Sequence, residues 1–307
     1  NTQRDSEEGL REEVVRILGQ GYDVLHLHTS SWRGFLIEQI AMEMGIKKVI
    51  VHAHSTGIDV TDCVEREKQI REHENYKDQF SMEYATDVCA CSVLAADWLF
   101  GSKIPRDRIR ILPNAVDAGK YRFDPIRRQI IRESLNLEGR IVIGNGGRYS
   151  YQKNQEFLIK AFVQAYENNP SLFLLCLGEG EMLKSLKKLI NQFHIEDSTL
   201  CIEWQTNVED YLQAMDTFCL PSKFEGLPIS AIEAQASGLR CLISDCVTKE
   251  VRITELVKFL PLDEEYWARE LEECKIDLDR GSQDDKIARA GYDIRIAAEQ
   301  LGYLYSR

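Results

Sequence analysis

Two carboxylates in one stretch of the chain, Glu225 and Glu233, have the spacing and surroundings of a binding or catalytic site. Residues 217–245 read TFCLPSKFEGLPISAIEAQASGLRCLISD, which predicts a strand, a turn, a helix from Pro228 that ends at Gly238, and a second strand. Free N–H groups at the start of such a helix attract anions. The two glutamates beside such a turn could work as a general acid and base. A buried strand–helix–strand connection with two incidental glutamates would give the same pattern.

A pair of cations follows another predicted strand, at residues 141–144. Arg148 and Lys153 stand just before a predicted helix at residues 155–167. A planar guanidinium and an ammonium beside free helix N–H groups suit a diphosphate, whereas two solvated surface cations would show the same spacing. A nicotinamide dinucleotide fingerprint is excluded, because its sixth position needs a small residue and holds Tyr149.

A glycine turn, Gly178-Glu179-Gly180-Glu181, follows a further predicted strand at residues 172–177. Glycine lets a backbone approach a ligand closely, but most turns of this composition are only turns. The turn therefore indicates a binding site only in combination with the two cations, Arg148 and Lys153.

Four histidines form two His-x-His pairs at the ends of predicted strands, His26 with His28 and His52 with His54. Positions i and i+2 of a strand point to the same face of its sheet. A metal-dependent hydrolase could use such pairs as ligands, but it would need further ligands at strand ends, and the remaining histidines do not fall there. We therefore expect no metal site. We expect at least one of these histidines to lie at the carboxyl ends of the strands, where a ligand would bind.

Short apolar runs alternate with helical patterns in two blocks, residues 1–120 and 121–307, which predicts an α/β chain of two doubly wound domains. The second block begins with a basic helical connector at residues 121–137. Strands are expected at residues 23–28, 48–54, 87–91, 109–112, 141–144, 172–177, 200–203, 217–221 and 240–244. Ligands of such sheets bind beyond the carboxyl ends of the strands, where the turns with Arg148, Lys153 and Glu225 fall.

Composition excludes several functional classes. A length of 307 residues with 44% hydrophobic and 29% charged content is typical of a folded chain with two domains. A net charge of −12 argues against nucleic-acid binding. The nine cysteines are scattered and form no zinc-type pair, which is typical of a reducing compartment and predicts a cytoplasmic protein. No apolar run approaches the ~20 residues that span a bilayer.

Taken together, these motifs resemble the family 4 glycosyltransferases of the GT-B fold, and most of all the bacterial enzymes of capsular and exopolysaccharide synthesis. The resemblance covers the chain from about Tyr22 to its end. The motifs that carry it are Gly147-Arg148 with Lys153-Asn154, Gly178-Glu179-Gly180, and the run from Ser222-Lys223-Phe224-Glu225-Gly226-Leu227-Pro228 to Glu233-Ala234. Pro113-Asn114-Ala115-Val116-Asp117 also matches, with alanine where the family usually has glycine.

The resemblance implies two Rossmann-like domains and a retaining transfer of a sugar from a UDP- or GDP-sugar to an acceptor hydroxyl, without a metal or cofactor. Arg148 and Lys153 would bind the diphosphate and stabilise its charge as it leaves. Glu225 would bind hydroxyls of the donor sugar, and Glu233 those of the ribose. His54, with His52 as the alternative, matches the family histidine that lies beside the donor sugar.

The remaining expectations concern the backbone contacts, the acceptor and the chain ends. The acceptor would be a sugar or a lipid-linked sugar, with a weak peripheral contact to the inner face of the plasma membrane. A helix at residues 284–305, with Tyr292, would cross back to the first domain. Backbone groups of a set of loop residues would also approach the donor, namely Gly147, Gly178, Gly180, Gly226 and Leu227.

The sequence departs from the family pattern at its N-terminal end. The first domain of the family opens with a strand and a glycine-containing loop, and here these are expected to be missing, so that the first domain is truncated. A nucleotide-sugar-binding remnant without catalysis is therefore an alternative function. A metal-dependent hydrolase built on the two His-x-His pairs is a third.

Overall fold

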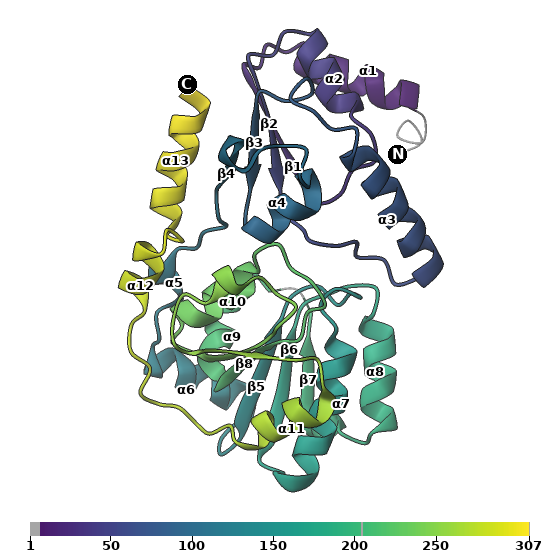
Figure 1. Cartoon of the computed structure of the whole chain (residues 1–307). Coiled ribbons are helices and arrows are strands. Elements are labelled where there is room, and N and C mark those ends of the chain that lie inside the picture. Colours follow the sequence, from purple (N-terminus) through teal and green to yellow (C-terminus); the bar gives the residue numbers. More distant parts are fainter. Residues whose placement is uncertain (1–6, 204, 307) are drawn as a thin grey trace. The chain divides into compact units, whose positions relative to one another are not determined.

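The computed structural model describes residues 7–203 and 205–306, and its contacts divide the chain into two compact units (Figure 1). The first unit comprises the residues up to Ile58, Asp62–Pro113 and the residues from Ala298. The second unit comprises Asp59–Thr61 and Asn114–Ala297. Both sheets are parallel, which confirms the predicted α/β class with two domains.

The first unit has a four-stranded parallel sheet in the order β1-β2-β3-β4, flanked by helices (Figure 1). Its strands are β1 (Val24–Thr29), β2 (Lys48–Ala53), β3 (Asp87–Ala90) and β4 (Ile109–Ile111). Its helices are α1 (Glu7–Leu18), α2 (Leu36–Glu43), α3 (Cys63–Lys77) and α4 (Val93–Phe100). The β2 run KVIVHA is buried along almost its whole length, as a central parallel strand requires. Asp62 caps α3 and Ser92 caps α4, each by accepting a hydrogen bond from a backbone N–H.

The second unit has a six-stranded parallel sheet in the order β10-β9-β8-β5-β6-β7. Its strands are β5 (Ile141–Gly146), β6 (Leu172–Leu177), β7 (Thr199–Ile202), β8 (Thr217–Leu220), β9 (Arg240–Ser244) and β10 (Val257–Leu260). The chain runs outward from β5 to β7 and then returns to pair β8 with the other side of β5. This reversal makes the junction of β5 and β8 the switch point of a doubly wound sheet, where the loops diverge and leave a crevice for a ligand.

Helices of the second unit fill the connections between its strands. They are α5 (Ala118–Tyr121), α6 (Pro125–Ser134), α7 (Gln155–Asn168), α8 (Leu183–Gln192), α9 (Val208–Ala214), α10 (Ile229–Ala236), α11 (Glu264–Glu272) and α12 (Asp284–Arg289). The core beneath α7 and α11 holds the fully buried Phe162 and Trp267. All nine strands expected from the sequence are present, and β10 and α11 are elements that the sequence analysis did not assign.

The division between the units falls after Pro113, seven residues before the expected boundary. Residues 114–121 join the second unit because Val116 forms a parallel bridge with Asp293 and α5 packs on α10. The single helix expected at residues 284–305 is instead two, α12 and α13 (Ile294–Ser306). The break follows the positive φ of Gly291, and the C-terminal part of α13 belongs to the first unit.

A buried ion network fixes β8 to α6. Asp216, just before β8, is buried and accepts a hydrogen bond from Arg128 at 2.5 Å and one from Arg132 at 3.3 Å. The backbone N–H of Val142 donates to the same carboxylate at 2.7 Å. Because Val142 lies on β5, this carboxylate ties together the two strands of the switch point.

Glu38 on α2 is a buried carboxyl group with an expected effect on stability. Burial raises its pKa to about 7. Between the ordinary value of 4.5 and pH 7 the unfolded chain therefore binds fewer protons at this residue than the folded chain, so the free energy of unfolding falls as pH rises. We expect Glu38→Gln to raise the free energy of unfolding at pH 8 by up to about 3 kcal/mol, with little change at pH 5.

Urea unfolding of wild type and Glu38→Gln at both pH values measures this effect. Glu43→Gln is the matched control, because Glu43 lies on the same helix with a side chain 61% exposed. The control should shift stability by less than about 0.5 kcal/mol at either pH. If Glu38→Gln changed the free energy of unfolding by the same amount at pH 5 and at pH 8, ionisation of the buried Glu38 carboxyl would not destabilise the folded protein, and the account would be contradicted.

Among residues 7–203 and 205–306, no helix combines the length and the apolar character needed to cross a membrane.

Candidate functional site

A pocket of about 510 Å³ opens at the switch point of the second unit. The loops after β5 and β8 and the start of α10 form most of it, and the end of β6 with its turn, Gln205 and α9 complete it. The lining contains all four side chains expected to bind the diphosphate, the ribose or the sugar, namely Arg148, Lys153, Glu225 and Glu233. Of the residues expected to contribute backbone contacts, it contains Gly147, Gly178 and Leu227.

Lys153 and Glu225 meet inside this pocket. The Nζ atom of Lys153 donates to Oε1 of Glu225 at 2.7 Å, and the hydroxyl of Ser222 donates to the same oxygen at 2.8 Å. Gln152 donates to Oε2 at 2.9 Å. The carboxylate thus holds the ammonium at the pocket wall, and two of the three N–H donors of Lys153 remain for a ligand.

Arg148 lies in the same loop but has a different environment. Arg148 is exposed, and its guanidinium makes no hydrogen bond or ion pair within the described part of the chain. Its backbone carbonyl accepts a hydrogen bond from Gln155, which holds the loop against α7. The position of the backbone is therefore fixed, while the guanidinium is available to an anion.

The N-terminus of α10 faces the pocket without a side-chain cap. Leu227, Pro228, Ile229 and Ser230 all line the cavity, and Pro228 at the N-cap cannot supply a capping side chain. The hydroxyl oxygen of Ser230 is buried and has no hydrogen-bond partner among the described residues. Uncapped N–H groups and an unpaired hydroxyl make this helix start a site for an anion. The sequence analysis did not single out Ser230.

Glu233, one turn further along α10, is held by a tyrosine. The hydroxyl of Tyr121 donates to Oε1 of Glu233 at 2.6 Å. Burial raises the pKa of Glu233, and the hydrogen bond from Tyr121 opposes this. Burial, and then the adjacent carboxylate, also raise the pKa of Tyr121, so its proton stays on the phenol. One oxygen of Glu233 is thus fixed, and the sequence analysis missed the residue that fixes it.

The glycine turn after β6 packs against the loop after β5. A Cβ atom at Gly178 would lie 2.0 Å from the carbonyl oxygen of Gly147, and one at Gly180 would lie 2.3 Å from that of Tyr149. Both glycines have positive φ angles. The close approach that glycine permits here is therefore between two loops of the protein. Gly178 also lines the pocket, whereas Gly180 and Gly226 are not part of the lining that the described residues form.

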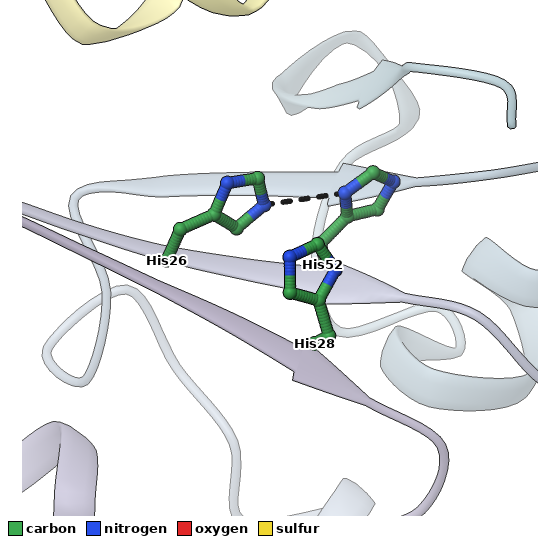
Figure 2. Close-up of side chains that lie close together, drawn as sticks. All are labelled: His26, His28 and His52. Atoms are coloured by element: carbon green, nitrogen blue, oxygen red, sulfur yellow. Dashed lines mark hydrogen bonds between the residues drawn. The ribbon is translucent and has the colours of Figure 1, made fainter. Parts of the chain in front are cut away.

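The two histidine pairs come together at the end of the sheet in the first unit. Nε2 of His26 lies 3.2 Å from Nδ1 of His52 (Figure 2). Nδ1 of His28 lies 2.8 Å from Nε2 of His54. Burial, with the neighbouring histidine charges second, lowers the pKa of His26 to about 4 and that of His52 to about 3. Both imidazoles are therefore neutral at neutral pH. The expected role of His54 beside a donor sugar stays a prediction.

Sequence comparisons relate the chain to glycosyltransferases, and structure comparisons show its fold. Residues 127–257 match the family model of glycosyl transferases group 1. EpsF of Bacillus subtilis, which carries the name of a glycosyltransferase, is 28% identical over 243 residues, covering 75% of this chain and 59% of that protein. The UDP-Gal:alpha-D-GlcNAc-diphosphoundecaprenol alpha-1,3-galactosyltransferase of Escherichia coli is 26% identical over 229 residues, covering 73% of this chain and 58% of that protein. The chain thus spans about three fifths of the length of these relatives.

Among solved structures, HepE of Anabaena in complex with UDP and glucose matches with a TM-score of 0.78 and 18% identity, covering 97% of this chain and 81% of that one. Sucrose-phosphate synthase of Thermosynechococcus elongatus matches with a TM-score of 0.72 and 18% identity, covering 97% and 78%. At these identities the structural matches establish the fold, which is GT-B. The family match over residues 127–257 relates this part of the chain to the group 1 glycosyltransferases.

Proposed function

We propose that the protein is a retaining glycosyltransferase that moves a sugar from a UDP- or GDP-sugar to an acceptor hydroxyl in the synthesis of a surface polysaccharide or glycolipid. The observation that carries the proposal is the convergence of Arg148, Lys153 and the uncapped start of α10 on one pocket. Two cations and a helix N-terminus bind a diphosphate, and the same groups stabilise the charge that the diphosphate gains as it leaves the sugar.

The carboxylates of the pocket complete a donor site. Oε2 of Glu225 accepts a hydrogen bond from Gln152 and keeps a lone pair for a sugar hydroxyl. Oε1 of Glu233 is occupied by Tyr121, and its other oxygen is directed to hydroxyl groups of the ribose in this proposal. The carboxylates then orient the donor, while Arg148 and Lys153 stabilise the leaving group.

The relatives support the choice of donor and acceptor. The name of the Escherichia coli relative gives UDP-galactose as donor and a diphosphoundecaprenol-linked sugar as acceptor. A structure of Anabaena HepE holds UDP-glucose. We infer a nucleoside-diphosphate sugar as donor and a sugar or lipid-linked sugar as acceptor for this protein too.

A turnover assay tests this function. UDP- and GDP-sugars are incubated with the protein and with diphosphoundecaprenol-linked sugars in detergent, and the released nucleoside diphosphate is measured. We expect release from one donor class, its loss in Lys153→Met, and a product whose anomeric configuration, read by NMR, is that of the donor. Nucleotide binding without release from any donor would contradict the transferase and favour a binding protein without catalysis.

Tyr121→Phe should weaken nucleotide binding through Glu233. Without the phenol, the pKa of Glu233 rises further, because the hydrogen bond from Tyr121 lowers it. A protonated carboxyl is a poorer acceptor for ribose hydroxyls, so we expect affinity for UDP to fall by about 3- to 10-fold at pH 6 and by less at pH 8. Calorimetric titration at both pH values measures the change.

The matched control for this variant is Tyr266→Phe, which removes an exposed hydroxyl on α11. The control should bind UDP as the wild type does. Because the ribose is the group affected, uridine should lose affinity by the same factor as UDP in Tyr121→Phe. A loss for UDP alone, or none, would show that Tyr121 does not act through the ribose site.

A further inference from the structure

We propose that the first unit binds one divalent transition-metal ion, of which Zn²⁺ fits best, through His26, His28 and His52. One ring nitrogen from each of these histidines lies within 4.8 Å of the others. Figure 2 shows the three imidazoles gathered at the ends of neighbouring strands. Imidazole nitrogens are preferred ligands of Zn²⁺, and three of them with an open fourth position form a recurrent zinc site.

The backbone holds these ligands without any loop. His26 and His28 lie on β1 and His52 on β2, and His28 is the register partner of His52 in the parallel pair. Two residues along β1, His26 points to the same face as His28. The spacing of the ligands is therefore set by the sheet itself, which is the most rigid support available for a site.

The distance between the first two ligand atoms already matches a metal site. Nε2 of His26 and Nδ1 of His52 lie 3.2 Å apart. Zn–N bonds of 2.0–2.1 Å in a tetrahedral arrangement place two ligand nitrogens about 3.3 Å apart. The two nitrogens are thus already at the separation that a shared ion requires, and the rings need to turn so that both lone pairs point at the ion, while Nε2 of His26 gives up its proton.

The outer contacts of two of the rings leave one nitrogen of each for the ion. Nε2 of His52 lies 3.2 Å from the carbonyl oxygen of Leu112, which only accepts, so Nε2 carries the proton and Nδ1 keeps its lone pair. Nδ1 of His26 lies 2.7 Å from the hydroxyl of Tyr305, which can accept its proton once Nε2 binds the metal. Metal-bound histidines almost always donate their other N–H to such a partner.

The third ligand and the choice of ion follow from the same group. His28 is exposed, so an ion that it binds can be reached from solvent, and its contact with His54 at 2.8 Å orients the ring. The group contains nitrogen ligands only among the described residues. Mg²⁺ and Ca²⁺ prefer oxygen, so the site should discriminate against them.

Metal titration of the whole protein tests the proposal. All proteins carry Cys63→Ser and Cys246→Ser, which remove the two exposed thiols. ZnCl₂ is titrated calorimetrically, and Co²⁺ is followed by its visible absorption. We expect one ion per chain with micromolar or tighter affinity, a Co²⁺ spectrum of tetrahedral intensity, and no heat with Mg²⁺. His28→Asn should weaken Zn²⁺ binding by at least about 100-fold.

Two further variants make the result unambiguous. His194→Asn is the control, because His194 is an exposed histidine of the second unit at φ 53°, a conformation that asparagine also accepts. It should bind Zn²⁺ as the parent does. Tyr305→Phe, near the chain end, should keep the fold and weaken Zn²⁺ by about 10-fold through His26. An absence of binding in the parent, or equal affinity in the parent and in folded His28→Asn, would overturn the proposal.

Discussion

Replacing Arg148 by alanine is expected to weaken UDP binding by about 10- to 100-fold while leaving the stability of the protein unchanged. The guanidinium is exposed and makes no hydrogen bond or ion pair in the described part of the chain, so its removal costs the fold nothing. It lines the pocket beside Lys153, where a charge-assisted hydrogen bond to a phosphate contributes about 1.5–3 kcal/mol. Calorimetric titration of UDP into wild type and variant measures the loss.

The design separates the diphosphate from the nucleoside. Uridine lacks phosphate, so its affinity should be the same in Arg148→Ala and wild type. Arg289→Ala removes an exposed arginine from α12, away from the lining, and should leave both affinities unchanged. A parallel loss for uridine, or an undiminished affinity for UDP, would show that Arg148 does not bind the diphosphate.

Asp216→Ala is expected to lower the free energy of unfolding of the second unit by about 3–5 kcal/mol. The substitution leaves Arg128 and Arg132 buried without their counter-ion, and a buried charge that loses its partner costs this much. It also removes the acceptor for the N–H of Val142, so the two strands at the switch point lose a shared anchor. Scanning calorimetry should show the transition of the second unit at lower temperature, with that of the first unit unmoved.

The control for this variant is an ion pair on the surface that involves the same helix, α6. Arg127 on α6 and Asp210 on α9 form an ion pair at 2.9 Å with side chains 41% and 22% exposed. Exposed pairs contribute about 0–1 kcal/mol, so Asp210→Ala should change stability by no more than that. Equal effects of Asp216→Ala and Asp210→Ala would contradict the role of the buried network.

The parts of the fold that could be predicted from sequence are those with local causes. Buried parallel strands appear as short apolar runs, and all nine expected strands are present within one or two residues. Because the turns after such strands meet at one edge of the sheet, Lys153 and Glu225 could be assigned to one site although 72 positions separate them. The β10 and α11 elements were not assigned, and it is the tertiary core around the buried Trp267 that holds α11.

The parts that could not be predicted depend on contacts between elements. Tyr121 fixes Glu233 only because α5 packs on α10, and nothing in the residues around Tyr121 marks that pairing. The unpaired hydroxyl of Ser230 becomes visible only when its surroundings are known. The histidine pairs were each recognised, but a site for three histidines required the register that places His28 opposite His52.

The central claim is that the pocket at the switch point of the second unit binds a nucleoside diphosphate. Calorimetric titration of the wild-type protein with UDP and with GDP tests it most directly, because it measures the binding of each nucleoside diphosphate itself. We expect one of the two to bind with one site per chain and a dissociation constant of about 1–100 μM. If neither nucleotide binds at millimolar concentration, the pocket is not a donor site and the proposed transferase is contradicted.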